Sequence, residues 1–331
     1  MAEVVTAPPT GSTAAPPPAG DRSAGLILFG VLQLGVGAIC ALIALGVAAA
    51  MSTTPPAAGT MPATGALAPS MVVYGVAACY FVSVGVGSIR RRRWARALSA
   101  AVGALWLVFG VASAIVAFLA IPKLLVMVPR AQEKAFITGM AVFSVIFFIA
   151  LPLAIFLFYR SDRTRETCEL RDPRIRWTDR VPVPVLALTI LLGFTAISLL
   201  ISLTNPVVPL MGTILTGGPA AITMLALAGL CAFLTVQLYR LKESAWWTLV
   251  LLQVIGGIVG ALTMARIDIN EVYRSAGLLT PQVQAMHLEE LYRNPLLWVL
   301  MVAAWVAYFA FLLAIRKYFV GRGPRTRRGE V

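Results

Sequence analysis

Long apolar runs, separated by short polar segments, fill most of this chain of 331 residues. Eight of the runs reach the roughly 18–20 residues that a helix needs to cross the hydrocarbon core of a bilayer. Because an open strand edge cannot satisfy its backbone hydrogen bonds in lipid, each run is predicted to be a helix. The predicted spans are 25–50, 71–89, 97–121, 136–159, 183–204, 218–239, 245–265 and 296–316. The sequence therefore predicts an all-α fold, a polytopic transmembrane helical bundle.

The polar segments divide the chain into five parts. Residues 1–24 are rich in Pro and Ala, a composition that buries too little apolar surface to order itself, so they are predicted to be a disordered tail. The other parts are a first four-helix membrane unit at 25–160, a basic linker at 161–182, a second four-helix membrane unit at 183–318 and a basic tail at 319–331.

The two four-helix units resemble each other in sequence. An offset of 152 positions places Cys79 on Cys231 and Trp94 on Trp246. Apolar helices also resemble one another by chance, which is the alternative explanation. Each unit holds an even number of spans, so the copies would insert in the same orientation, related by a pseudo-twofold axis along the membrane normal. We therefore predict two tandem four-helix repeats.

The distribution of charge predicts how the chain is oriented in the membrane. Charged residues make up only 12% of the chain, about half of the roughly 25% found in soluble domains. Of the 27 Lys and Arg residues, 21 fall on one side of the predicted spans. That side comprises Arg22, five residues at 90–96, seven at 160–180, Arg240, Lys242 and six at 316–328. Since cytoplasmic loops carry the excess of Lys and Arg, both termini are expected in the cytoplasm.

Two motifs of the chain carry a resemblance to other proteins. They are Gly85-x-Gly-Ser-x-Arg-x-Arg-Arg-Trp-Ala-Arg96 and Thr167-Cys-Glu-Leu-Arg-Asp-Pro-Arg-Ile-Arg-Trp-Thr-Asp-Arg-Val-Pro-Val-Pro184. In these motifs the chain resembles a group of bacterial multi-pass membrane proteins that has no assigned activity. The resemblance implies a bacterial inner membrane as the location, and it implies no reaction.

Polar side chains inside the predicted spans are few, and this limits the transport mechanisms open to the chain. No Asp, Glu, Lys, Arg or His lies within a span away from its ends, whereas ion-coupled transporters depend on such residues. Gln33 and Gln253 are the largest polar side chains there, and both are expected to face the bundle, either in hydrogen bonds between helices or along a solute path. Gly256 and Gly260 form a G-x-x-x-G motif, which predicts close helix packing within the chain or against a second copy.

A run of arginines closes the second span and opens the third. Arg90, Arg91, Arg92, Arg93 and Arg96 act as a topology signal, and they are also candidates for contact with anionic lipid headgroups or a protein partner. The net charge of +13 could also suggest nucleic acid. Nucleic-acid binding is not expected, because the basic loops are short and no recognition module accompanies them.

The polar loop at 266–294, on the side poor in Lys and Arg, holds the candidate metal ligands. They are His287, Glu290, Asp268 and Glu271. One His without a second His or Cys is a thin basis for zinc, and the competing interpretation is a solvated interfacial helix from Pro281 to Arg293. The chain contains no G-x-S-x-G, no H-E-x-x-H, no Walker A sequence and no dinucleotide fingerprint, so neither an enzyme nor a cofactor is expected.

These patterns leave three hypotheses for function. The first is a non-enzymatic membrane scaffold or accessory subunit that acts through helix packing, anionic lipids, a membrane-protein partner or homo-oligomerisation. The second is a channel or facilitator for a small neutral solute, with Gln33 or Gln253 along its path. The third is a metal-dependent membrane enzyme that uses His287 with the nearby carboxylates.

Overall fold

The computed structural model describes residues 21–53, 63–125, 128–279, 283–284 and 288–320. Within these ranges, eight helical segments are long and apolar enough to cross a membrane, which confirms the predicted spans. The predicted tails at 1–24 and 319–331 lie almost entirely outside the described residues.

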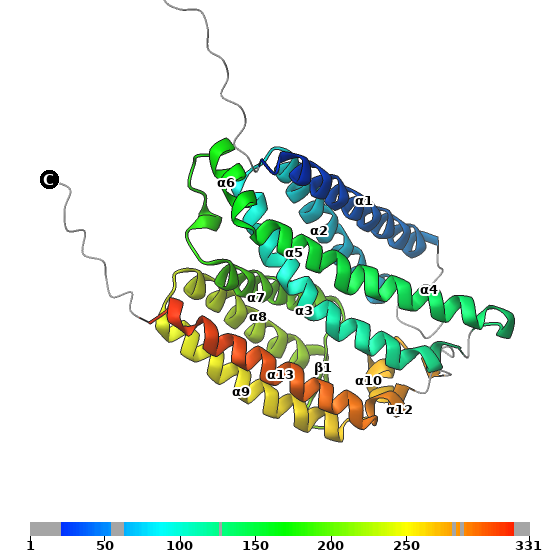
Figure 1. Cartoon of the computed structure of the whole chain (residues 1–331). Coiled ribbons are helices and arrows are strands. Elements are labelled where there is room, and N and C mark those ends of the chain that lie inside the picture. The colour runs from blue at the N-terminus through cyan, green and yellow to red at the C-terminus, as the bar shows by residue number, and fades with distance from the viewer. Residues whose placement is uncertain (1–20, 54–62, 126–127, 280–282, 285–287, 321–331) are drawn as a thin grey trace, which may run out of the picture.

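The eight spans are built from the following elements (Figure 1). The first three spans are α1 (Ser23–Thr53), α2 (Ala63–Ile89) and α3 (Arg93–Leu124). The fourth span consists of η2 (Arg130–Gln132), α4 (Glu133–Val145), the π-helix η3 (Ile146–Ala150) and α5 (Leu151–Arg160). The last four spans are α7 (Val183–Ile201) with η5 (Ser202–Thr204), α8 (Gly217–Tyr239), α9 (Glu243–Arg266), and α13 (Pro295–Ile315) with η6 (Arg316–Tyr318).

Helix α3 makes the most extensive contact between the two halves of the bundle (Figure 1). In the first half α1 packs along α2 and α3 packs along α5, and in the second half α7 packs along α8. Helix α3 also contacts α7 and α13, so it touches both halves. The larger cluster of buried apolar side chains accordingly contains Ala97 and Ala101 of α3 beside residues of α7, α8, α9 and α13.

Glycines allow the closest approach between spans. A Cβ atom on Gly30 of α1 would lie 2.9 Å from the carbonyl oxygen of Gly85 on α2, and one on Gly85 would lie 2.8 Å from the oxygen of Gly30. Gly110 of α3 faces the π-helix η3, where a Cβ would overlap the carbonyl oxygen of Phe148. Small residues of this kind let helix backbones meet in a membrane, where van der Waals packing drives association.

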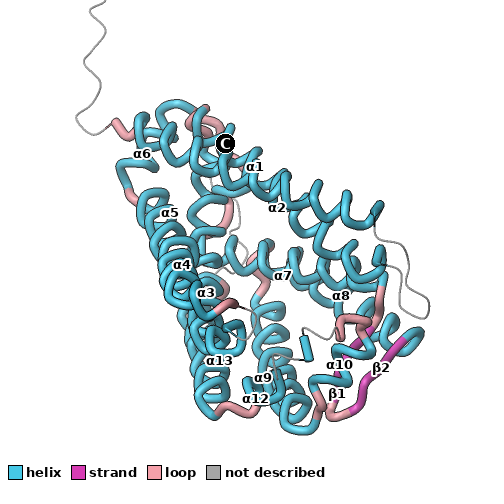
Figure 2. Tube along the Cα trace, turned by 90° about the vertical axis from the view of Figure 1, so that its right-hand side faces the viewer, coloured by secondary structure: helices cyan, strands magenta, loops and turns pink. Residues whose placement is uncertain are grey.

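Helix α6 (Asp162–Arg171) and a two-stranded hairpin lie outside the spans and were missed in the sequence. Helix α6 occupies the predicted linker, with the Ser161 hydroxyl accepting the backbone N–H of Thr164 as its cap. Strands β1 (Val207–Leu210) and β2 (Thr213–Thr216) form an antiparallel hairpin between α7 and α8, at the end of the bundle that also carries α10 (Ile269–Ser275) (Figure 2). Its two turn residues, Met211 and Gly212, both have positive φ, as a tight two-residue hairpin requires.

The tandem repeat stays a prediction. Both halves contain the same helix-to-helix turn, in which Arg91 and Leu241 take left-handed conformations with φ of 55° and 56°. These two residues lie 150 positions apart, whereas Trp94 and Trp246 lie 152 apart. The helix pairs also differ, because α3 packs closely along α5 while α9 contacts α13 only sparsely. At this turn, the alignment at an offset of 152 therefore pairs residues that do not occupy equivalent positions in the two halves.

Candidate functional site

The arginine-rich end of the bundle is formed by the α2–α3 turn, α6, η4 (Trp177–Asp179), the α8–α9 turn and η6. The α2–α3 turn closes with two backbone hydrogen bonds, from Arg91 N to the Ser88 oxygen at 2.9 Å and from Arg92 N to the Gly87 oxygen at 2.8 Å. This pattern ends α2 with a left-handed residue, a position that glycine usually occupies. After this turn, α3 begins at Arg93.

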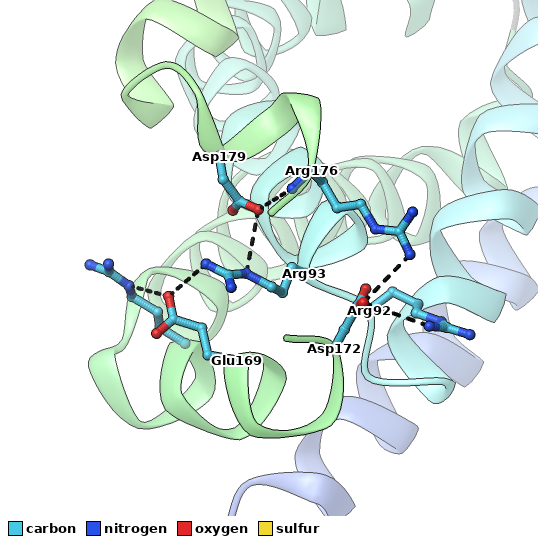
Figure 3. A network of polar contacts seen from close by, with 7 residues as sticks. Arg92, Arg93, Glu169, Asp172, Arg176 and Asp179 are labelled. Carbon is cyan, nitrogen blue, oxygen red and sulfur yellow. Dashed lines mark hydrogen bonds and ion pairs between the residues drawn. The ribbon is translucent and has the colours of Figure 1, made fainter. Parts of the chain in front are cut away.

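Arg93 is the centre of an ion-pair network that joins α3 to the linker (Figure 3). Its Nη2 donates to Glu169 Oε1 of α6 at 3.3 Å, and its Nε lies 3.4 Å from Asp179 Oδ2 of η4. Asp179 also accepts the backbone N–H of Arg176 at 3.0 Å. Only 15% of the Arg93 side chain is exposed, so these contacts are shielded from water more than ordinary surface pairs are.

Asp172, at the end of α6, is the most buried carboxylate of this network. Its side chain is 2% exposed, and its Oδ1 lies 3.4 Å from Arg176 Nη2 and 3.7 Å from Arg92 Nη1. A buried carboxylate needs charged partners to offset its desolvation, and these two arginines supply them. Arg92 and Arg93 are therefore occupied by contacts within the chain.

Three ionisable groups of α6 have shifted pKa values, Arg165, Cys168 and Glu169. The hydrogen bond from Arg165, 2.8 Å away, is the main cause that lowers the pKa of the Glu169 carboxyl, which favours the charged form in the ion pair. Burial raises the pKa of the Cys168 thiol to about 11, although Arg96 and Arg93 act in the opposite direction. Cys168 is fully buried, and the raised pKa favours the neutral thiol, which packs as a small apolar side chain.

The other arginines of the predicted run differ in exposure. Arg90 is exposed, while Arg91 and Arg96 are half-buried. The lipid-contact candidates therefore separate into exposed Arg90, two half-buried residues, and Arg92 and Arg93, which bind carboxylates of the linker.

Exposed apolar side chains in the linker were missed by the sequence argument. Leu170 is 72% exposed, Ile175 is 76% exposed and Trp177 is 51% exposed, although all three lie outside the spans. Arginines separate them in the sequence, at Arg171, Arg174 and Arg176. The Tyr239 hydroxyl at the end of α8 donates to the Trp177 carbonyl oxygen at 2.9 Å, which places this part of the linker at the boundary of the spans. The apolar residues interspersed with arginines in this segment were the sequence signal that could have indicated an exposed apolar surface.

A cluster of buried polar side chains lies inside the first half, close to the arginine-rich end. Gln33 of α1 donates through Nε2 to Ser99 Oγ of α3 at 2.9 Å. Its Oε1 accepts from Ser88 Oγ of α2 at 3.2 Å and from the hydroxyl of Tyr159 of α5 at 3.4 Å. The Tyr159 hydroxyl also donates to Ser88 Oγ at 2.8 Å. We call these four residues the Gln33 cluster; each is at most 2% exposed, and each comes from a different helix.

The remaining candidates inside the spans are placed differently. The side chain of Gln253 is half-buried and makes no hydrogen bond among the described residues; its backbone oxygen accepts from Trp305 Nε1 at 3.3 Å. A Cβ on Gly256 or Gly260 would meet no atom within 4 Å. The close approach is made by Gly257, where a Cβ would overlap the indole of Trp305. Neither residue of the G-x-x-x-G motif mediates close packing within the described chain.

The three metal-ligand candidates that the structure describes form no metal-binding group among the described residues. His287 lies outside the described residues. Asp268 caps α10 by accepting the Asn270 backbone N–H at 2.9 Å, and Glu290 of α12 (Leu288–Tyr292) forms an ion pair with Lys123 of α3. Glu271 lies in the first turn of α10. In the part of the chain that the structure describes, no three His, Cys, Asp or Glu residues gather in a group that could hold a metal ion.

The fold defines the class of this protein, a polytopic helical membrane protein with a basic end. Comparison with known protein-family models, with curated proteins and with solved structures found no match to the chain. The function of the protein therefore has to be inferred from its residues and their geometry.

Replacing Gln33 by Leu is expected to destabilise the protein by about 1–3 kcal/mol, because it leaves buried hydroxyls without their amide partner. Gln253→Leu is the matched control. It changes the same side chain in the same way within a span but removes no described side-chain hydrogen bond, so it should be neutral or stabilising. Thermal unfolding of both variants in one detergent measures the difference. Equal destabilisation by the two substitutions would contradict a structural role for the cluster.

Replacing Arg93 by Gln is expected to lower stability by about 1–3 kcal/mol, because Glu169 and Asp179 lose a shared cation. Arg90→Gln removes the same charge from the same turn at an exposed position and should change stability by less than about 0.5 kcal/mol. Chemical unfolding followed by tryptophan fluorescence compares them. The network has no stabilising role if the two variants unfold alike.

Proposed function

We propose that this chain is a non-enzymatic protein of a bacterial inner membrane, a scaffold or accessory subunit whose arginine-rich end is cytoplasmic and associates with anionic lipid headgroups. The observation that carries the proposal is the mixture of exposed apolar and exposed basic side chains in the linker, namely Leu170, Ile175 and Trp177 with Arg171 and Arg174 between them. Interfacial segments with this composition combine burial of apolar area with attraction to anionic lipids.

The charge balance of this end supports the same proposal. Residues 160–180 contain seven arginines against five carboxylates, and the adjacent run 90–96 adds five arginines and no carboxylate. The ion pairs engage Arg92, Arg93, Arg165 and Arg176. A surplus of exposed arginines is left, and each basic residue near an anionic surface contributes about 1 kcal/mol of attraction.

Three arginine–aromatic contacts, made by two arginines at the ends of spans, fit an interfacial location. The Arg316 guanidinium carbon lies 5.5 Å from the ring centroid of Trp246 and 5.4 Å from that of Trp247. Arg160 lies 5.6 Å over Phe156. Aromatic rings and long basic side chains are favoured at the level of the headgroups, where one part is apolar and the other is wet.

The facilitator hypothesis has less support. Gln33 is hydrogen-bonded to three side chains of its own bundle, so its amide is not free to serve a solute. Neither Gln33 nor Gln253 lines the cavity that opens near α10. The enzyme hypothesis depends on His287, which lies outside the described residues. Association with lipid, with a membrane-protein partner or with a second copy remains the function that the geometry supports best.

The orientation is tested by cysteine labelling in intact cells. A cysteine replacing Gly277, beside α10, is expected to react with a membrane-impermeant maleimide, because the arginine-poor end faces outward under the positive-inside rule. A cysteine replacing Arg90 is expected to react only after the membrane is permeabilised. The reverse pattern of labelling would refute a cytoplasmic arginine-rich end.

Lipid association is tested with the purified chain in detergent micelles doped with phosphatidylglycerol or phosphatidylcholine. Phosphatidylglycerol should raise the unfolding temperature more. Arg174→Gln combined with Ile175→Ser should weaken that effect, with about tenfold lower apparent affinity for the anionic lipid. Arg274→Gln with Leu278→Ser is the matched control, because it removes one exposed arginine and one exposed apolar side chain at the opposite end. Equal stabilisation by both lipids in the unmodified protein would refute the proposal.

A further inference from the structure

A cavity of about 630 Å³ opens at the end of the bundle opposite to the arginine-rich end. The last residues of α9, the helices α10 and α12, and the start of α13 form its walls. Its volume lies in the range of sites that bind small organic molecules, about 300–1,000 Å³. Such sites combine apolar walls with a few converging polar groups. The charged side chains that line this cavity therefore determine which class of ligand it could bind.

The carboxylates that line the cavity are engaged within the chain. Asp268 Oδ1 accepts the backbone N–H of Asn270 at 2.9 Å and thereby caps α10. Glu289 Oε2 accepts Asn270 Nδ2 at 3.2 Å. These hydrogen bonds hold both carboxylates against the protein.

The two arginines of the cavity, in contrast to its carboxylates, have no partner among the described side chains. Arg266 and Arg293 both line it, and among the described residues neither forms an ion pair or a side-chain hydrogen bond. Within the described residues, the N–H groups of both guanidinium groups are therefore available to a ligand. A guanidinium group recognises carboxylate and phosphate oxygens through paired N–H donors.

Neighbouring elements restrict the side chains around these arginines. The hairpin turn packs on the stem of Arg266, since a Cβ on Gly212 would lie 2.9 Å from the Arg266 Cβ. The Met211 backbone N–H donates to Thr263 Oγ1 of α9 at 2.8 Å, which fastens the same turn to α9. Trp298 Nε1 donates to the Tyr292 carbonyl oxygen at 3.0 Å, so the indole has a fixed position in the wall.

We propose that this cavity binds an organic anion, a carboxylate or phosphate attached to a small apolar or aromatic group. Arg266 and Arg293 hold the charged oxygens, and Tyr292 and Trp298 pack against the apolar part. The start of α13 adds positive potential, because the partial charge at a helix N-terminus is positive. This site lies at the other end of the bundle from the lipid-binding segment of the proposed function and does not depend on it.

The first experiment compares three probes of similar size on the full chain in detergent, by isothermal titration calorimetry and thermal unfolding. The probes are phenyl phosphate, benzyl alcohol and benzylamine. Saturable binding and stabilisation by phenyl phosphate, with no effect of the neutral and cationic probes, is the expected result. Equal effects of all three probes would overturn the proposal, as would the absence of phenyl phosphate binding. This comparison needs no variant and so does not depend on a variant folding.

The second experiment uses Arg266→Gln and Arg293→Gln, with Arg274→Gln as the control because Arg274 is exposed at the same end but does not line the cavity. Each cavity substitution should weaken phenyl phosphate binding about tenfold, the effect of one lost charge-assisted contact. The control should bind as the unmodified protein does. An equal loss in the control would overturn the assignment to these two arginines.

The anion could belong to a soluble molecule or to a lipid headgroup, and a competition experiment separates the two sources. Phosphatidylglycerol is added to micelles that contain the protein and phenyl phosphate, with phosphatidylcholine as the comparison. Displacement by phosphatidylglycerol alone supports the site and assigns it to an anionic headgroup. Undiminished binding of phenyl phosphate supports the site and assigns it to a soluble anion.

Discussion

The hydrogen bonds of the Gln33 cluster are the interaction on which the arrangement of the first half depends. An amide or hydroxyl without a partner in an apolar medium costs about 2–7 kcal/mol, and lipid offers no alternative partner. Four helices each supply one side chain to this point, so a rotation of any helix about its own axis would leave donors or acceptors unsatisfied. Apolar contacts tolerate such rotations far better. The cluster thus sets the orientation of each helix, including the turn from which Arg93 reaches the linker.

The eight spans could be predicted because the length of an apolar run is a property of the sequence alone. The same is true of their starts, where Pro184 and Pro295 stand in the first turn of a helix and need no N–H partner. The hairpin between α7 and α8 could not be predicted in this way. Its turn is Met211-Gly212, and Met carries little of the preference for positive φ that marks Asn-Gly or Asp-Gly turns.

The positive charge of the candidate site could be predicted from the sequence, but its ion pairs could not. The arginine run indicated a cationic surface, yet the partners of Arg93 lie 76 and 86 positions further along the chain, at Glu169 and Asp179. Which arginine is engaged and which is exposed depends on the packing of α6, and no local pattern contains that information. The packing glycines show the same limit. The motif drew attention to Gly256 and Gly260, while the neighbouring Gly257 meets the indole of Trp305.

Both ends of α3 are anchored by charge. At one end Arg93 binds the linker, and at the other Lys123 is paired with Glu290 of α12. Helix α3 also contacts both halves of the bundle. The ion pairs at its two ends oppose displacement of the helix along its own axis. Such a sliding movement of α3, through the bilayer, would have to break the ion pairs at both of its ends.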